Sequence, residues 1–173
     1  MSVAPPTLRE IYEAELPYVW NTLRRLGVPE RHVEDVAHEV FMVVHRIRDS
    51  YDPTRPIRPW LFGISFRTAS DFKKRAHFTR EIYDPTAERI DSRPNAEALL
   101  HVVERRKWVH AALIELDDDL RVVFVLIDID ECSAPEAAAT LGIPVNTVYS
   151  RLRRARARFE EAVRRVRGSE VVS

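Results

Sequence analysis

The sequence of 173 residues contains little of what several common kinds of site require. It has one cysteine, Cys132, so no disulfide can form within the chain, which suits a reducing compartment. It has four glycines, and they form no glycine-rich phosphate-binding loop. No apolar run reaches the roughly 18 residues of a membrane span, and the first residues show no secretory signal. We therefore expect a protein of the cytoplasm without membrane insertion.

Catalytic and metal-binding patterns are also missing. None of the six histidines has another histidine four residues away or a cysteine at zinc-binding spacing, so we expect no metal site. The aspartates at positions 117–119 are more typical of helix caps than of cation ligands. No nucleophile, base and orienting group come together in the pattern. The sequence thus predicts neither an enzyme nor a bound cofactor.

The residues that are present favour helices. Apolar residues make up 45% of the chain, and they recur at helical spacing over 7–26, 30–48, 60–80 and 96–116. Pro17 predicts a kink or a break in the first of these helices. The apolar run over 120–129 has the β-branched composition of a strand, but it has no partner strand, so we expect a buried helix. The fold class is predicted to be all-α.

The helical pattern fails between residues 81 and 95, where Pro85 and Pro94 occur. This failure predicts two small helical domains joined by a linker. We place the first domain at residues 1–80, a flexible linker at 81–98 and the second domain at 99–168.

Residues 133–158 have the pattern of a helix-turn-helix. Ser133 and Glu136 predict a capping box at the start of a short helix, and Gly142 suits the left-handed residue that ends it. A second helix is expected to start near Val145. Its apolar positions form one buried seam of Val148, Leu152, Ala155, Phe159 and Val163.

The other faces of this second helix are rich in arginine. Residues 142–168 contain eight arginines and two glutamates, a net charge of +6, whereas residues 101–141 carry a net charge of −5. A solvated basic face is the simplest interpretation of such a helix. The uneven charge in a neutral chain instead favours one surface for phosphates and another for a different partner. The candidate DNA-binding residues are Asn146, Thr147, Tyr149, Ser150, Arg151, Arg153, Arg154, Arg156 and Arg158.

Three segments, in order, resemble one family. Residues 33–41 (VEDVAHEVF) and 52–64 (DPTRPIRPWLFGI) are similar to region 2 of the extracytoplasmic-function, or group 4, sigma factors of bacterial RNA polymerase. Residues 142–156 (GIPVNTVYSRLRRAR) are similar to the region 4 helix-turn-helix of the same family. The resemblance implies a sigma factor that binds core polymerase and directs promoter recognition and DNA melting.

The resemblance also implies partners and sites. Asp35, His38, Glu39 and Met42 would contact the clamp helices of the largest polymerase subunit, and the flap of the second-largest subunit would be a further contact. An anti-sigma factor is also implied as a partner. The single-stranded minus-10 element would be held by Tyr51, Asp52, Arg55, Arg58, Arg67, Ser70, Asp71, Lys73, Lys74 and Arg75.

The duplex minus-35 element would be read by the second helix of the helix-turn-helix. Tyr149, Ser150, Arg153 and Arg154 would reach base edges, while Thr147 and Arg151 would hold phosphates, with Arg156 and Arg158 as secondary contacts. An alternative remains open, namely a stand-alone helix-turn-helix transcriptional regulator with an N-terminal dimerisation or ligand module. Such a regulator has no need for a proline-rich loop followed by Trp60 and a basic helix.

Overall fold

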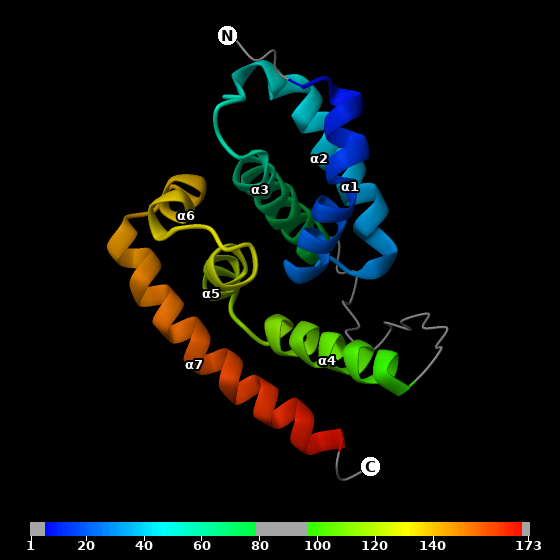
Figure 1. Ribbon diagram of the computed structural model, residues 1–173, viewed down its shortest axis with the longest axis vertical. Helices are drawn as coiled ribbons and strands as arrows, with labels where there is room; N and C mark the ends of the chain where they lie inside the picture. Colours follow the sequence, from blue (N-terminus) through cyan, green and yellow to red (C-terminus); the bar gives the residue numbers. More distant parts are fainter. Residues whose placement is uncertain (1–5, 79–96, 171–173) are drawn as a thin grey trace.

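The structure is a computed structural model that describes residues 6–78 and 97–170 (Figure 1). Every regular element in these ranges is helical, so the all-α prediction is confirmed. The elements are α1 (Leu8–Arg25), α2 (Glu30–Ile47), the short turn η1 (Arg48–Ser50), α3 (Ile57–Phe78), α4 (Glu97–Ile114), α5 (Asp118–Phe124), the π-turn η2 (Val125–Ile129), α6 (Ala134–Leu141) and α7 (Val145–Glu170). The linker expected at 81–98 lies almost wholly in the gap between the two described ranges, residues 79–96.

Helix α1 begins with a complete capping box, in which Thr7 and Glu10 bond each other's backbone N–H groups. The break that Pro17 led us to expect is absent, because α1 continues through it as one element of 18 residues. Proline removes one backbone donor, and the side chain of Asn21 donates to the Pro17 carbonyl at 2.8 Å. The one hydrogen bond lost at Pro17 is thus not enough to end the helix.

The third helix starts earlier than its periodicity predicted. We expected a start at Trp60, and α3 begins at Ile57 with Pro59 in its first turn. The first N–H groups of a helix have no partner within it, so a proline costs little there. The tryptophan lies partly buried against the core, and its ring is 5.0 Å from that of Tyr51.

The apolar run over 120–129 is a buried helix, as expected, and it continues from α5 into η2. Residues 120–126 are all buried. The role expected for the aspartates before it is only partly right. Asp117 occupies the cap position but makes no side-chain capping bond, whereas Asp118 and Asp119 form ion pairs with other helices.

The helix-turn-helix prediction is confirmed in detail. Ser133 and Glu136 form the predicted capping box at the start of α6. Gly142 ends this helix with φ +67°, a left-handed conformation that glycine adopts without a steric penalty. Helix α7 then begins at Val145, the predicted residue.

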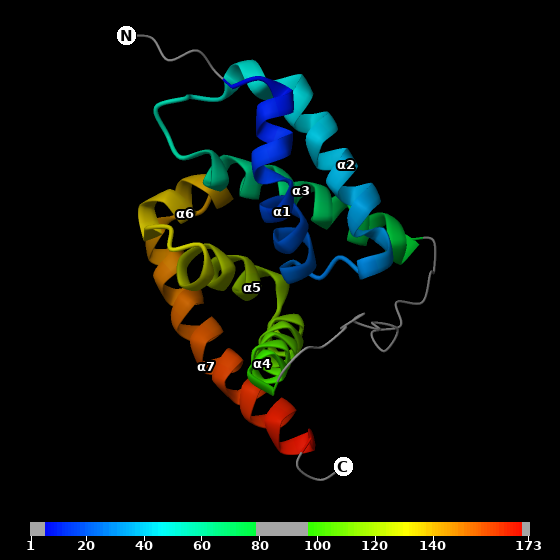
Figure 2. The same cartoon turned by 45° about the vertical axis from the view of Figure 1, so that its right-hand side comes forward.

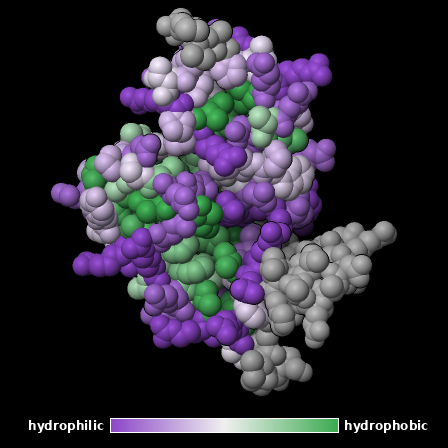
Figure 3. Space-filling model, viewed as in Figure 1, coloured by the Kyte–Doolittle hydropathy of each residue, from purple (hydrophilic) through white to green (hydrophobic). Residues whose placement is uncertain are grey.

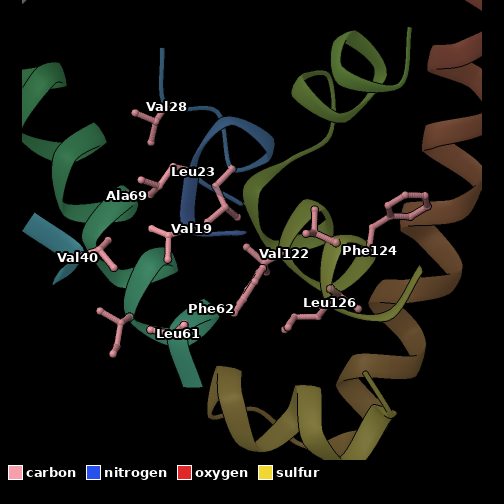
Figure 4. Packing of buried hydrophobic residues seen from close by; sticks show 14 of the residues in the cluster. Val19, Leu23, Val28, Val40, Leu61, Phe62, Ala69, Val122, Phe124 and Leu126 are labelled. Carbon is pink, nitrogen blue, oxygen red and sulfur yellow. The ribbon is translucent and has the colours of Figure 1, made fainter. Parts of the chain in front are cut away.

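Helices α1–α3 and α4–α7 pack against each other instead of standing apart (Figures 1 and 2). One cluster of buried apolar residues runs through both sets, from Val19 in α1 to Val148 in α7. Figure 4 shows Val19 and Phe62 of the first set close to Val122 and Leu126 of the second. The sequence predicted two domains, but it did not predict that they share a core.

A buried arginine lies where the two sets meet. Arg121 is 6% exposed, and each of its five N–H groups has an acceptor. The acceptors, at 2.7–3.1 Å, are the carbonyl oxygens of Leu26, Leu113, Ile114 and Leu116 and Oδ1 of Asp118. The guanidinium thus joins the end of α1 to the end of α4.

The close approach of Arg121 to the end of α1 requires a glycine at position 27. Gly27 has φ +86°, and a Cβ atom at this position would lie 2.8 Å from Nη1 of Arg121. A side chain here would therefore be strained in its backbone and would also displace the guanidinium.

None of the helices in the described ranges has the length and apolar character needed to span a membrane.

Replacing Arg121 with methionine is expected to destabilise the whole chain. A buried acceptor left without a donor costs about 1–3 kcal/mol, and several carbonyls would lose theirs, so we expect the free energy of unfolding to fall by about 3 kcal/mol or more. Urea unfolding of Arg121→Met measures this loss. The control is Arg106→Met on the exposed face of α4, which should change stability by less than about 0.5 kcal/mol. Equal effects of the two substitutions would contradict the role of Arg121.

Candidate nucleic-acid interface

Helix α7 is held by the seam that the sequence predicted. Val148, Leu152 and Ala155 are buried, and the ring of Phe159 packs on that of Phe124 with centroids 4.5 Å apart. Because these contacts fix the rotation of α7, the opposite side of its first four turns faces outward. Tyr149 is an exposed large hydrophobic residue on this side, with 57% of its surface accessible.

The candidate minus-35 residues differ in exposure. Thr147 and Arg151 are partly buried, and the others are exposed: Asn146, Tyr149, Ser150, Arg153, Arg154, Arg156 and Arg158. The Ser150 hydroxyl donates to the carbonyl of Thr147 at 3.0 Å. This face is therefore a stripe of amide, hydroxyl and guanidinium groups on one helix.

Three arginines of α7 are paired with acids of the preceding helices. Arg156 forms a bidentate pair with Asp128, with N–O distances of 2.9 and 2.6 Å. Arg151 lies 3.3 Å from Asp119. Arg165 lies 2.6 Å from Glu115 at the far end of α7. The acidic segment thus partly neutralises α7, and the expectation of two separate charged surfaces holds only in part.

The other exposed arginines among the candidate residues of α7 differ from these three. Within residues 6–78 and 97–170, Arg153, Arg154 and Arg158 form no ion pair. A guanidinium that is exposed and unpaired can bind a base edge or a phosphate without first leaving an acid. These three arginines are therefore the stronger candidates for direct contact, and Arg151 and Arg156 also hold α7 against α5 and η2.

The proline-rich loop before α3 is ordered by its own side chains. The Tyr51 hydroxyl donates to the carbonyl of Arg55 at 2.6 Å. Oδ1 of Asp52 accepts from the backbone N–H of Thr54 at 3.0 Å and from its hydroxyl at 2.6 Å. These bonds lower the pKa of Asp52, which keeps the carboxylate charged. Arg58 pairs with Glu15 of α1 at 3.0 Å, so the loop is also attached to the bundle.

The structure does not bring all the candidate minus-10 residues together. Arg58 and Arg75 are separated by about 25 Å along α3, at a rise of about 1.5 Å per residue. Arg75 faces α2, where it pairs with Glu39 at 2.8 Å. Lys73 faces α5, where it pairs with Asp118 at 2.9 Å. The predicted set therefore divides into a loop at the start of α3 and two faces near its end.

The remaining members of this set lie between those places. Arg67 donates from Nε to the Gly63 carbonyl at 2.9 Å, and the Ser70 hydroxyl donates to the carbonyl of Phe66 at 2.8 Å. Asp71 and Lys74 lie 3.8 Å apart on the exposed side. Their hydrogen bonds are thus made within α3 itself.

The predicted core-binding strip on α2 is mostly exposed. Asp35, His38 and Met42 are exposed, Met42 at 49%. Glu39 is partly buried because of its bidentate contact with Arg75. Glu39 thus also forms an ion pair within the chain, whereas no ion pair of Asp35 or His38 is found in the part of the chain that the structure describes.

Sequence reasoning missed the residues that join the two helical sets. The Tyr18 hydroxyl donates to Oδ2 of Asp130 at 2.6 Å, although the two residues are 112 positions apart. Burial and this contact raise the pKa of Tyr18. For Arg121 a signal was present, because it is the only basic residue in an apolar run over 120–129. A lone charge in such a run indicates either an edge of the helix or a buried, fully bonded cation.

Comparison with known proteins shows which family this chain belongs to. Residues 11–79 match the family model described as Sigma-70 region 2, and residues 106–159 match Sigma-70, region 4. The RNA polymerase sigma factor CnrH of Cupriavidus metallidurans is 32% identical over 146 residues, which are 79% of this chain and 75% of that protein. The ECF RNA polymerase sigma-E factor of Escherichia coli K12 is 31% identical over 145 residues, 79% and 76% of the two chains.

Two solved structures of sigma factors are similar to this structure. The structure of CnrH in complex with the cytosolic domain of CnrY has a TM-score of 0.60 at 28% identity, and the match covers 89% of this chain and 85% of that one. The sigma factor RpoE of Bartonella quintana, in complex with the anti-sigma factor NepR, shares the fold, with a TM-score of 0.71 over 90% and 96% of the two chains at 22% identity.

The class defined by these two regions is that of the sigma-70 factors. The chain belongs to this family, within its extracytoplasmic-function group, and it is an alternative sigma factor. The match over residues 11–79 also decides against the stand-alone regulator, because a dimerisation or ligand module would not be a sigma region 2.

A pair of alanine variants separates base reading from phosphate binding on α7. Arg154 and Arg158 are both exposed and unpaired, one turn apart. Arg154→Ala is expected to lose about 1–3 kcal/mol of discrimination at one or two bases of the minus-35 element. Arg158→Ala should weaken all promoters about equally and lower the salt slope by about one. Run-off transcription over a library of minus-35 variants measures both, and identical losses would contradict the assigned reading face.

Proposed function

We propose that this sigma factor contacts core polymerase through α2, the minus-10 element through the loop at residues 51–58 and α3, and the minus-35 element through α7. The observation that carries the proposal is the presence, in one chain, of an exposed arginine face on α7 and an ordered loop before α3. A sigma factor needs both surfaces, because the α7 face would bind the minus-35 element and the loop would bind the minus-10 element. The domain boundaries 1–80, 81–98 and 99–168 belong to the same proposal.

Duplex recognition is supported by the chemistry of the α7 face. An α-helix fits the major groove, where arginine bonds guanine in a bidentate manner and phosphates accept from other basic groups. Arg153 and Arg154 provide unpaired guanidinium groups, and Tyr149 projects beside them. Thr147 and Ser150 at the start of the helix are close to where phosphates approach a helix N-terminus.

Capture of the melted strand is supported by the order of the loop. The hydrogen bonds of Tyr51 and Asp52 fix the loop without DNA, so little conformational entropy would be lost when a base binds. Arg55 is exposed next to these residues and provides a cation for a phosphate or a base face. Lys74, 74% exposed, provides another near the end of α3.

Two surfaces suit contacts with core polymerase. On α2 and α3, a shallow groove of about 210 Å³ is bordered by Glu39, Met42, Val43, Asp71 and Arg75, next to the exposed Asp35 and His38. This groove suits the clamp helices. Between α4 and α7, an apolar groove of about 450 Å³ suits a hydrophobic segment of the flap (Figure 3). Its lining is Trp108, Val109, Phe159 and Val163, with Arg105 and Arg167 at its rim.

An anti-sigma factor is part of the proposal. Two structures similar to this one, those of CnrH and RpoE, were solved in complexes, with the cytosolic domain of CnrY and with the anti-sigma factor NepR. A partner of this kind would hold the chain inactive until a signal releases it. We propose in addition that the chain acts in the cytoplasm, without membrane insertion, cofactor or enzymatic activity of its own.

Run-off transcription with purified core polymerase and a genomic promoter library tests the proposed function. Transcripts that start only when the chain is added would support it. The chain alone should bind promoter duplex weakly, with a dissociation constant of about 10⁻⁶ M or higher at physiological salt, because each half makes few contacts. Specific nanomolar binding without polymerase, and no transcripts with it, would contradict the proposal.

The contact assigned to α2 can be tested with charge-matched variants. Asp35→Ala combined with His38→Ala should weaken core binding by at least about tenfold, or about 1.4 kcal/mol, without lowering stability, because both side chains are exposed. Fluorescence titration with core polymerase gives the affinity, and a thermal melt gives the stability. Glu34→Ala on the same helix is the control and should bind normally. Normal binding by the double variant would remove α2 from the assigned contact.

A further inference from the structure

Two acidic side chains of the second helical set hold arginines of α7. Asp119 in α5 lies 3.3 Å from Arg151. Asp128 in η2 accepts from Arg156 at 2.9 and 2.6 Å. Both acids come from the segment that packs on the seam of α7, and Figures 1 and 2 both show α5 beside α7. The packing of the two helices therefore fixes the acids next to these arginines.

The two paired arginines border the outward face of α7. They are five positions apart, which is about 140° around a helix of about 3.6 residues per turn. The buried seam, with Leu152 and Ala155, lies between them on one side of the helix. Arg153 and Arg154 lie between them on the other side, and neither forms an ion pair in the described part of the chain. The acids thus hold the arginines at the two edges of the face and leave the two at its centre unpaired.

The edges and the centre of a recognition helix meet different parts of DNA. The major groove is about 12 Å wide, so a helix in it has base edges in front of its outward face and a sugar–phosphate backbone on each side. Contacts to base edges carry sequence information, whereas contacts to phosphates form on any duplex. The pairing on α7 therefore follows the kind of contact. The arginines placed to read bases are unpaired, and those placed beside phosphates are bound to carboxylates.

Each acid competes with phosphate for its arginine. The Asp128 side chain is 23% exposed, and it binds both Nε and Nη2 of Arg156 in a bidentate pair. In the other pair, the Arg151 side chain is the less exposed partner, at 28%. A phosphate that approaches either guanidinium meets a carboxylate of the same charge sign next to it, and their repulsion opposes the contact. Binding of phosphate thus requires that an existing ion pair be broken or that two anions be brought together.

We propose that Asp119 and Asp128 are specificity-determining residues, which withhold their two arginine partners from phosphates and so reduce binding to DNA of any sequence. This inference rests on the proposed function for the assignment of α7 to duplex DNA. Non-specific binding comes from phosphate contacts, so the loss of two contacts lowers it directly. The base contacts assigned to the centre of α7 do not use the paired arginines. The ratio of promoter binding to random binding therefore rises, and this ratio decides occupancy when about 10⁶–10⁹ other sites compete.

Random-sequence duplex tests the proposal with the full chain alone. Asp119→Asn combined with Asp128→Asn keeps the size of both side chains and removes both charges. We expect a fluorescent random-sequence duplex of about 30 base pairs to bind about tenfold more tightly to this variant, because two phosphate contacts are gained. The salt slope should increase by about two over about 50–200 mM salt. Fluorescence anisotropy measures both quantities.

The matched control removes two charges that hold no candidate DNA-binding arginine. Asp117 precedes α5 in the same acidic segment, and no ion pair of Asp117 is found among the residues that the structure describes. Glu160 lies on α7 itself and pairs with Arg164 at 3.7 Å. Asp117→Asn combined with Glu160→Gln should change the affinity for random duplex by less than about twofold, because salt screens exposed charges that make no contact. An equal gain in both double variants would make the effect one of net charge and overturn the proposal.

Substitution of the released arginines shows whether the gain passes through them. Arg151→Gln and Arg156→Gln, added to the variant without the two acids, restore the net charge of the parent. They should return the affinity and the salt slope to the parent values within about twofold. A gain that persists without the two arginines would overturn the proposal.

A single variant covers the case in which loss of the bidentate pair unfolds the chain. The Asp119 side chain is 46% exposed and makes one contact at 3.3 Å, so Asp119→Asn should fold. It should bind random duplex about threefold more tightly, with a salt slope larger by about one. Unchanged affinity and slope in this folded variant would overturn the proposal.

Transcription by the holoenzyme separates this proposal from the proposed function. On a promoter that the parent transcribes with core polymerase, random-sequence competitor should inhibit the variant without the two acids at a concentration at least about threefold lower than it inhibits the parent. Equal inhibition would overturn the role in specificity. If the parent produces no transcript from any genomic promoter, the proposed function fails, whereas tighter binding of random duplex by the same variant would still support the role of the two acids.

Discussion

Arg121 places a cation between the end of α1 and the end of α4, with all five of its N–H groups bonded and only 6% of its surface exposed. The last carbonyls of a helix have no donor within the helix, and here one side chain donates to carbonyls at the ends of both helices. Gly27 leaves the room for it, and Asp118 provides the nearby negative charge. Because the helix that carries Arg121 also packs on α3 and α7, the position of α7, the proposed DNA-reading helix, depends on this contact. Removing the cation would leave several buried carbonyls unpaired, so the arrangement is fixed by hydrogen bonding as much as by apolar burial.

The same packing connects the two surfaces that we propose bind the promoter. The unpaired arginines of α7 face outward, while the Ser70 and Lys73 side of α3 is turned toward α5. Acids on α5 and η2 hold Arg151 and Arg156, so these helices position α7 and cover α3 at once.

Local features of the fold could be predicted because local chemistry determines them. The Ser133–Glu136 capping box and the left-handed Gly142 follow from residue types three and nine positions apart, and the structure has both. The break that Pro17 allowed did not occur, because one lost hydrogen bond does not end α1, and the start of α3 was missed because Pro59 is tolerated in a first turn. For the site, the exposed stripe on α7 follows from its seam, but the pairing of Arg156 with Asp128 and of Tyr18 with Asp130 does not. These partners are 28 and 112 residues apart, and no periodicity encodes such contacts.

If α1–α3 and α4–α7 share one core, they must unfold together. Native-state hydrogen exchange of the free chain, followed by NMR over increasing urea, measures the opening free energy of buried amides in each set. The shared core predicts that the amides of Val19 in α1, Ile64 in α3, Val123 in α5 and Leu152 in α7 converge on one value, that of global unfolding. Convergence on two distinct values, with one set exchanging while the other stays protected, would show two independent domains and contradict the shared core.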